Sequence, residues 1–372
     1  MTIPAEHADA QTPRFADPDL LAQGFDAALA AGEECERWLT VAGRTVRLRS
    51  ASPEMLSRLS RAFTHLVRPP AEAADLTVSL WDSVAAEGSA PALPDIGGGH
   101  QPGAFFYHSD ERVRAGFQLG TSGDARVLAV YPGEVTPYVS ALDGEGLQAW
   151  HWVADASCIP YWEEATPLCY LLDWWLARVG IRQLHAGAVG TTTGGVLLVG
   201  KSGSGKSTST LACLDSDLLF AGDDFVGVGV DPEPHVHSLY ASGKVMPDHV
   251  ERLPFLMPAL DNADALATEK AVVYAHEHWP RAVTEGFPLK ALLAPRVVPG
   301  LRESHVVEIS RGQGLAALAP STVFQMHTQA GSSLASMTRL VGRIPCYELQ
   351  LGSDIGSIPR AIGGLLDRLE RR

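Results

Sequence analysis

Two groups of residues near the middle of the chain have the types and spacing needed to handle a phosphoryl group. The first, "GKSGSGKS" from Gly200 to Ser207, matches the pattern G-x-x-x-x-G-K-[ST] and lies between an apolar strand, "GGVLLV", and a helical segment, "KSTSTLACL". Gly203 and Gly205 let successive backbone N–H groups turn inward around an anion. Lys206 can reach the β- and γ-phosphates, and the hydroxyl of Ser207 suits Mg²⁺. The pattern predicts a site for a nucleoside triphosphate.

The second group is a pair of adjacent aspartates, Asp223 and Asp224, at the end of the apolar strand in "SDLLFAGDDFV". Only 16 residues separate Asp223 from Lys206. Open α/β sheets bind ligands at the carboxyl ends of their strands. One carboxylate can hold Mg²⁺ through water while the other accepts a proton from an attacking hydroxyl. A helix cap or turn pair is the alternative, but the short distance to the loop favours direct transfer of a γ-phosphoryl group.

Three basic residues and one histidine in the same half of the chain are further candidates. Lys244, in "SGKV", follows Asp224 by 20 residues, Lys270 precedes a β-type run, and Arg339 lies on a late helix. Each could place positive charge on a phosphoryl group or on an acidic group of the substrate, with a solvated side chain as the alternative. His185, in "IRQLHAGAVG", is better explained from its own residues as a core histidine.

Metal-binding patterns are weak. The pairs His235/His237 and His276/His278 have HxH spacing, but no cysteine or carboxylate cluster accompanies them. We expect alternating histidines on strands with a structural role. The five cysteines are scattered without CxxC spacing, which indicates reduced thiols rather than a disulfide framework or a zinc site.

The composition is that of an ordinary globular protein. The chain has 372 residues, 46% of them hydrophobic and 19% charged, and a formal net charge of −14. This excess of acid disfavours nucleic acid and anionic membranes as partners. No apolar run approaches about 18 residues, and the acidic N-terminus lacks the apolar core of a secretion signal. We therefore expect a cytoplasmic protein with no membrane contact, and leave open whether it forms a homo-oligomer.

The chain divides by pattern into three parts. Residues 1–33, rich in Ala, Asp, Gln and Pro, predict a flexible arm. Residues 34–160 carry short β-type runs and one helix, "SPEMLSRLSRAFTHLV", and predict a smaller, β-rich α+β domain with mostly antiparallel pairing. Residues 161–372 begin with the apolar helix "ATPLCYLLDWWLARVG" and then alternate β-type and helical segments. They predict an α/β domain with a sheet flanked by helices, which carries the loop and the aspartates.

The succession of phosphate-binding loop, short helix and strand ending in "DD" resembles the HPr kinase/phosphorylase family. More distantly, it is similar to the nucleotide site of ATP-dependent phosphoenolpyruvate carboxykinases. The resemblance covers roughly residues 165–350 and includes "LHAGAV", where His185 matches a histidine that the family places before its loop. It implies a P-loop kinase domain of this type at the C-terminal end of the chain.

The family resemblance also implies residue roles. Asp223 would be the general base that deprotonates a protein serine, and His185 would lie beside the transferred phosphate. Asp224 would support Mg²⁺ together with Ser207. The region "SLYASGKVMPDHV" departs from the glycine-rich signature that the family links to phosphorolysis, so the reverse reaction and HPr as substrate are not implied.

A narrower resemblance involves the whole chain. The β-rich N-terminal block, "LHAGAV", "GKSGSGKST", "GDDFV", "YASGKV" and "IPCYELQLGSDIGSIPRAI" look like the HPr-kinase-like enzymes encoded with lasso peptide biosynthesis genes. Those kinases phosphorylate the C-terminal serine of a precursor peptide. The resemblance implies such a peptide as substrate, with Lys244, Lys270 and Arg339 as candidate contacts to its carboxylate.

Together these observations predict a serine kinase that uses ATP and Mg²⁺, with Asp223, His185 and Lys206 as catalytic residues. Two alternatives remain: a nucleotide-binding regulatory module with little or no transfer, and a kinase of free serine or another small alcohol. The acidic pair favours transfer, because binding alone needs no base. The residues expected to bind ATP are Gly200, Lys201, Ser202, Gly203, Ser204, Gly205, Lys206, Ser207 and Thr208.

Overall fold

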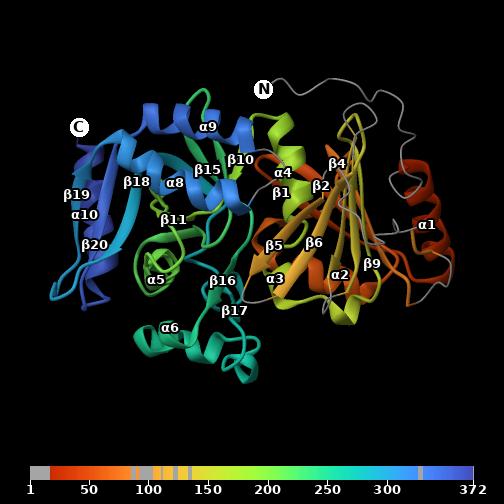
Figure 1. The fold of residues 1–372 in the computed structure, drawn as a ribbon, viewed down its shortest axis with the longest axis horizontal. Helices are drawn as coiled ribbons and strands as arrows, with labels where there is room; N and C mark the ends of the chain where they lie inside the picture. The colour runs from red at the N-terminus through yellow and green to blue at the C-terminus, as the bar shows by residue number, and fades with distance from the viewer. Residues whose placement is uncertain are drawn as a thin grey trace. The chain divides into compact units, whose positions relative to one another are not determined.

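The computed structural model describes residues 17–84, 89–91, 104–109, 112–119, 125–132, 136–325 and 330–371. The chain forms two compact units (Figure 1). The first consists of residues 1–37, 46–58 and 73–159, and the second of residues 38–45, 59–72 and 160–372.

One sheet formed by residues 35–153 has the strand order β3-β1-β2-β4-β9-β8-β7-β6-β5. Most of its strands belong to the first unit, whereas β3, the 3₁₀ helix η2 and the end of β1 fall within the residues of the second. The pairings of this sheet are mostly antiparallel, as predicted, but β4 pairs in parallel with both β2 and β9. The elements up to residue 153 are α1 (Pro18–Ala31), β1 (Cys35–Val41), β2 (Arg44–Ser50), α2 (Pro53–Ser60), the 3₁₀ helix η2 (Arg61–Leu66), β3 (Val67–Arg68), β4 (Leu76–Asp82), β5 (Ala104–Ser109), β6 (Arg112–Leu119), β7 (Arg126–Pro132), β8 (Tyr138–Leu142) and β9 (Gln148–Val153).

The prediction of a flexible arm over residues 1–33 is wrong for residues 18–31, which form α1, while residues 1–16 lie outside the described ranges. Asp17 caps the helix by accepting from the backbone N–H of Asp19 at 3.0 Å, and Pro18 occupies the first helical position. Leu21 and Phe25, one helical turn apart, are buried in the core of the first unit. The Ala- and Asp-rich composition concealed this short apolar stripe.

The predicted helix after residue 52 is confirmed, although it changes character along its length. α2 ends at Ser60, and the 3₁₀ helix η2 continues to Leu66. The apolar residues that predicted it are all buried: Leu56, Leu59, Phe63 and Leu66. The second predicted helix, near residues 166–180, is α4 (Cys169–Arg178), which begins after Leu168, a residue in a left-handed conformation with φ of 57°. A separate short helix, α3 (Tyr161–Ala165), ends before it.

The second unit is a mixed α/β fold around a sheet with the order β10-β14-β15-β18-β12-β11-β13. β20 extends the sheet beside β18, and β19 pairs with β20. β18 pairs in parallel with β12 and β20, and the other pairings are antiparallel. The remaining elements are β10 (Ile181–Leu184), β11 (Gly187–Gly190), β12 (Gly195–Leu198), α5 (Lys206–Ala212), β13 (Leu219–Gly222), β14 (Val226–Gly229), β15 (His235–Ser238), β16 (Ser242–Val245), α6 (Pro247–Arg252), β17 (Ala271–Tyr274), α7 (Ala275–His278), β18 (Gly286–Val297), β19 (His305–Ile309), α8 (Arg311–Gln325), α9 (Ala330–Arg343), β20 (Cys346–Leu351) and α10 (Ser357–Glu370).

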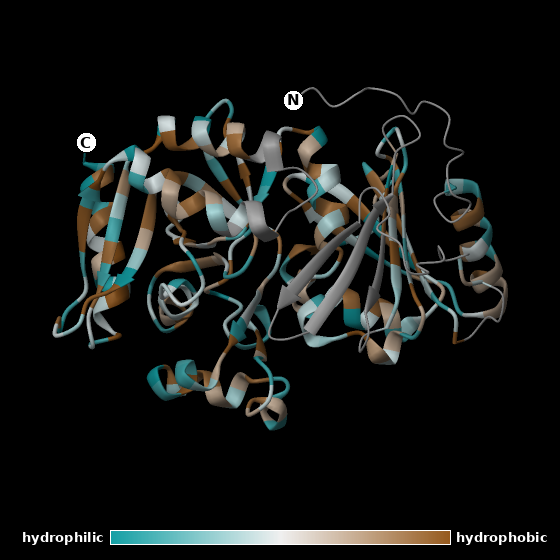
Figure 2. Cartoon of the chain, in the orientation of Figure 1, coloured by the Kyte–Doolittle hydropathy of each residue, from teal (hydrophilic) through white to brown (hydrophobic). Residues whose placement is uncertain are grey.

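Helices cover both faces of this sheet, as predicted for the C-terminal part of the chain (Figure 1). Successive residues of β12 alternate between two cores. Leu197 packs in the core that includes Leu318 of α8 and Leu340 of α9. Leu198 packs in the opposite core, which includes Ile362 of α10. Burial on both faces explains why "GVLLV" is a continuous apolar run. The helix α10, which covers one of these faces, has both brown and teal residues in Figure 2.

A separate two-stranded ribbon of β16 and β17 stands next to α5. Leu211 of α5 packs in a core with Val245 and Val273, one from each strand of the ribbon. The ribbon carries Lys244 on β16, and Lys270 directly precedes β17. The ribbon thereby brings two predicted cations to the side of the helix that follows the glycine-rich loop.

None of the helices in the described ranges is both long enough and apolar enough to cross a membrane.

Candidate active site

Two places where strands of the sheet are interrupted create the site. The segment predicted as one strand around "LHAGAV" is interrupted at His185, between β10 and β11, and the aspartates lie in a second interruption between β13 and β14. β10 pairs with β14, with Leu184 opposite Val226, and β11 pairs with β13, with Ala188 opposite Gly222. Because the strands pair on both sides of the breaks, the two interruptions face each other and their polar side chains meet.

The glycine-rich loop connects β12 to α5, as its sequence predicted. Gly203 and Gly205 have φ angles of 75° and 101°, a region that favours glycine. Lys206 is only 8% exposed, and its Nζ donates to the carbonyl of Gly200 at 2.6 Å. The lysine therefore lies inside the turn of its own loop. Ser207 follows on the first turn of α5 and is half-buried.

Asp224 is held by two basic side chains. His185 Nε2 lies 2.9 Å from Asp224 Oδ1, and Lys244 Nζ lies 2.6 Å from Asp224 Oδ2. Burial opposes ionisation of Asp224, but the charges and hydrogen bonds of Lys244 and His185 hold its pKa well below the usual range. Asp224 is consequently a fixed, ionised carboxylate.

Asp223 has the opposite environment. Its side chain is 2% exposed, and neither carboxyl oxygen has a hydrogen-bond partner. The Ser207 hydroxyl and the backbone N–H of Lys244 face this group, but neither meets the geometry of a hydrogen bond to it. Burial, followed by the negative charge of Asp224, raises the pKa of Asp223 to about 7. This carboxyl group is thus uncommitted and can exchange a proton near neutral pH.

Two adjacent aspartates therefore differ in both partners and proton affinity. A buried polar group without a partner is costly, and groups of this kind gather at functional sites. Lys206 is affected by the same charges: burial lowers its pKa, the two aspartates oppose that effect, and Lys270 reinforces it. A buried ammonium, a hydroxyl and an uncommitted carboxyl group thus converge at the start of α5.

The structure brings most of the predicted site residues together. His185, Asp223 and Asp224 lie at the two interruptions, and Lys244 reaches Asp224 from β16. Ser207 and Lys206 of the loop lie near Asp223, and Lys270 is close enough to Lys206 to affect its pKa. Lys270 is half-buried, and its ammonium makes no hydrogen bond or ion pair within the described part of the chain.

Arg339 is engaged elsewhere. Its side chain is 60% exposed and forms an ion pair with Asp231, in the turn between β14 and β15. Arg343, one turn later on α9, donates to the same carboxylate at 2.9 Å and to the carbonyls of Val230 and Pro232. Arg339 and Arg343 therefore attach α9 to this turn, and neither bonds to the loop or to the aspartates.

The two HxH pairs differ from each other. His235 and His237 share one face of β15, with ring centroids 4.8 Å apart, and burial lowers the pKa of both. His276 and His278 lie on the short helix α7, so the expectation of a strand is wrong for that pair. Across the described ranges, no group of three or more His, Cys, Asp and Glu side chains could hold a metal ion.

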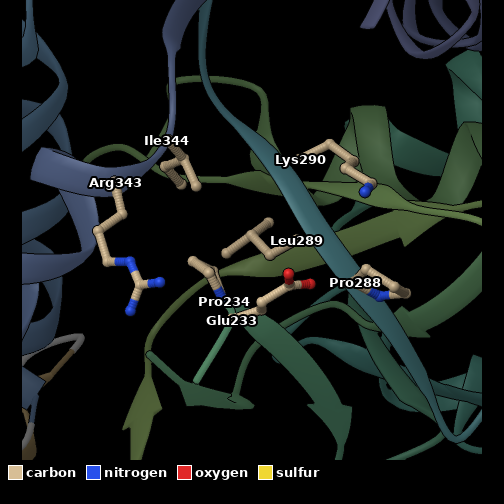
Figure 3. A pocket seen from close by; sticks show the side chains of 7 residues that line it. All are labelled: Glu233, Pro234, Pro288, Leu289, Lys290, Arg343 and Ile344. Carbon is tan, nitrogen blue, oxygen red and sulfur yellow. The ribbon is translucent and has the colours of Figure 1, made fainter. Parts of the chain in front are cut away.

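A hollow of about 330 Å³ lies away from the glycine-rich loop and the two aspartates. Figure 3 shows its lining: Glu233, Pro234, Pro288, Leu289, Lys290, Arg343 and Ile344. None of the loop residues or aspartates contributes to it, and the guanidinium of Arg343 is already bonded to Asp231 and two carbonyls. We therefore assign the chemistry to the loop and the aspartates rather than to this hollow.

Sequence reasoning missed three residues that support the site. Thr322, fully buried on α8, accepts a hydrogen bond from the backbone N–H of His185 at 3.2 Å. Gly187 lets β11 approach α5 closely, because a Cβ at this position would lie 2.2 Å from Oγ1 of Thr210. Thr210 in turn donates to the carbonyl of Lys206 at 2.9 Å. Only the adjacency of Gly187 to "LHA" could have signalled any of these contacts.

No protein-family model matches the sequence, and comparison with curated proteins finds no match. Among solved structures, the chain is similar to the Hpr(Ser) kinase/phosphatase from Coxiella burnetii. The identity is 13% and the TM-score 0.30, over 51% of this chain and 90% of that chain. A similarity at this level is too low to assign a function, so a function has to be inferred from the residues of the site.

Proposed function

We propose that the chain is an ATP- and Mg²⁺-dependent kinase that transfers the γ-phosphoryl group to a serine hydroxyl. One observation carries the proposal: Asp223 is a buried carboxyl group without a hydrogen-bond partner, and it lies beside the hydroxyl and lysine of a glycine-rich loop. A protein that only binds a nucleotide has no need for such a group.

The loop supplies the phosphate site in this proposal. Residues 200–208 surround the triphosphate with backbone N–H groups, and Lys206 exchanges its bond to the carbonyl of Gly200 for bonds to phosphate oxygens. Its burial makes the bare ammonium costly to maintain, which favours an anion as its partner.

The residues present also fit Mg²⁺. Ser207 offers a hydroxyl oxygen at the start of α5, and Asp224 is an ionised carboxylate with its side chain 22% exposed. Mg²⁺ prefers oxygen ligands and usually retains several waters beside phosphate oxygens. When bound, the ion neutralises charge on the phosphates. Ser207 and Asp224 are therefore the residues that would hold it.

Asp223 is the proposed base. The serine hydroxyl loses its proton to the Asp223 carboxylate as its oxygen forms a bond to the γ-phosphorus. The bond between that phosphorus and the bridging oxygen breaks, and ADP leaves with the bonding electrons. A pKa of about 7 leaves a large ionised fraction near neutral pH and makes the group basic enough to accept the proton.

The proposed acceptor is the C-terminal serine of a precursor peptide, as the lasso peptide kinases suggest by resemblance. Lys270 supports this choice, since its ammonium lies near Lys206 and has no bonded partner among the described residues. It is available for an acceptor carboxylate next to the transferred phosphate. A flexible peptide end can enter such a site without unfolding a partner protein.

The test is to incubate the protein with γ-labelled ATP, Mg²⁺ and a panel of acceptors, and to locate the phosphate by mass spectrometry. The panel contains peptides ending in serine, peptides with an internal serine, and free serine. The expected result is phosphate on a serine with wild-type protein, and formation of that product roughly 10²–10⁴-fold slower with Asp223→Asn. ATP binding without transfer to any acceptor would indicate a regulatory module instead.

A further inference from the structure

Lys244 lies in a setting that differs from that of a substrate-binding cation. It lies on β16, opposite Val272 of β17, and its side chain is 17% exposed. Its Nζ lies 2.6 Å from Asp224 Oδ2, within the range of a strong charge-assisted hydrogen bond. The ammonium is therefore already paired with a carboxylate of its own chain.

Two further titratable groups lie near the same ammonium. Glu163 on α3 and the thiol of Cys169 on α4 both lie close enough to Lys244 to act on it electrostatically. The charges of Asp224 and Glu163 thus both favour the ammonium form of Lys244, whereas burial raises the pKa of the Cys169 thiol and keeps it neutral near pH 7. An additional carboxylate or phosphate would compete with Asp224 for this ammonium and would be repelled by Glu163.

Asp224 has its second oxygen bound by His185 at 2.9 Å. With one basic group on each oxygen, the carboxylate cannot rotate without breaking a short bond. The backbone of His185 is itself bonded to Thr322, so one side of this arrangement is anchored in α8. The other side is anchored by β16 through Lys244. The orientation of Asp224 relative to Asp223 and Ser207 is therefore fixed from two directions.

We propose that Lys244 is a positioning residue, which acts on phosphoryl transfer by fixing Asp224 and makes no contact with the acceptor. This inference rests on the proposed function of the site, and it reassigns a residue that the sequence suggested as a substrate contact. In this proposal Lys244, on β16, sets the orientation of the Asp224 carboxylate next to Ser207.

The variants that test it are Lys244→Met, which keeps the stem and removes the charge, and Lys244→Arg, which keeps the charge. Removing a residue that orients a metal ligand typically costs 10–100-fold. We expect Lys244→Met to lower kcat by this factor with the acceptor KM unchanged, and Lys244→Arg to restore part of the loss. Because Lys244 acts through Asp224, the double variant Asp224→Asn/Lys244→Met should be no slower than Asp224→Asn alone.

A binding measurement separates this inference from the proposed reaction. The affinity for a fluorescent ATP analogue is measured with Mg²⁺ and with a chelator, using wild-type protein, Lys244→Met and the control Lys290→Met, which removes a lysine outside the site. Lys244→Met should reduce the gain in affinity that Mg²⁺ provides and leave the affinity in chelator unchanged. An equal Mg²⁺ gain in wild-type protein and Lys244→Met overturns the inference, even if no acceptor is phosphorylated. A raised acceptor KM at constant kcat also overturns it.

Discussion

His185 and Asp224 are 39 positions apart in the chain, yet His185 Nε2 lies 2.9 Å from Asp224 Oδ1. The contact exists because two strands are each interrupted at the same level of one sheet. On either side of the interruptions the chains pair again, β10 with β14 and β11 with β13. The sheet thus places a histidine and two aspartates at one point without placing any of them within a strand.

The loop lysine gives the first prediction. We expect Lys206→Met to reduce nucleotide affinity by at least tenfold, because the ammonium of Lys206 lies inside the turn of the loop, against the carbonyl of Gly200. The far-ultraviolet circular dichroism spectrum should stay unchanged. Lys290→Met, which removes a lysine of the same unit outside the site, is the control. Wild-type nucleotide affinity in Lys206→Met would refute the assignment of the loop.

The two aspartates should respond differently to amide substitution. Asp223→Asn should lower the rate of transfer by roughly 10²–10⁴-fold with nucleotide affinity retained, since an amide accepts no proton. Asp224→Asn should weaken the dependence on Mg²⁺ and lower stability, because it leaves Lys244 without its counter-charge. Single-turnover rates, nucleotide affinities and thermal unfolding measure the three effects. Small and equal effects of both substitutions would contradict this division of roles.

Asp223 also predicts a pH dependence of stability. With its pKa raised to about 7, the folded chain keeps a proton that the unfolded chain has lost above about pH 4. Because the folded state binds more protons in this window, the free energy of unfolding decreases as the pH rises from about 4 to about 7. Each pH unit corresponds to about 1.4 kcal/mol, so this group changes stability by a few kcal/mol.

Asp223→Asn removes the titrating group and provides the comparison. Denaturant unfolding of wild-type protein and the variant at pH 5 and pH 8 should show a smaller loss of stability in the variant. In wild-type protein, the rate of phosphoryl transfer should increase from pH 5 to pH 8, because Asp223 ionises in this range. If both proteins lose the same stability between the two pH values, Asp223 does not carry the raised pKa.

The fourth prediction concerns the stability of the second unit. Phe63, in η2, is 1% exposed, and its ring centroid lies 5.4 Å from that of Tyr240. Phe63→Ala should lower the free energy of unfolding by roughly 3–5 kcal/mol. Arg360→Ala, which removes an exposed ion pair with Asp354 in the same unit, should cost no more than about 1 kcal/mol. Denaturant unfolding measures both, and equal costs would show that Phe63 does not contribute to the core as described.

Sequence reasoning predicted those parts of the fold whose cause is local. The loop between strand and helix, the alternation of helices and strands after residue 165 and the apolar stripe of α2 and η2 all follow from residue spacing. The apolar run of β12 is continuous because both of its faces are buried, a pattern that sequence shows directly.

The contacts that define the site depend on pairing between distant segments. From its own residues, His185 is indistinguishable from a core histidine until the break between β10 and β11 is seen. Lys244 and Arg339 looked equivalent as candidate cations, yet one is bonded to Asp224 and the other to Asp231. The different proton affinities of Asp223 and Asp224 likewise result from burial and from neighbours that are distant in the sequence.

The last prediction concerns how an acceptor is chosen. Lys244 and Arg339 are each paired with an aspartate, so among the cations predicted to contact substrate Lys270 alone has its ammonium unbonded in the described ranges. If Lys270 holds the carboxylate of a C-terminal serine, wild-type protein should phosphorylate a peptide ending in a free acid with at least tenfold higher kcat/KM than the same peptide ending in an amide. Lys270→Met should abolish this preference by slowing the reaction of the acid alone. Lys244→Met should slow both peptides by the same factor, because it acts through Asp224. Mass spectrometry locates the phosphate in each product. Equal use of acid and amide by wild-type protein, or phosphorylation of free serine alone, would refute recognition of a peptide C-terminus, whatever the fate of the kinase assignment.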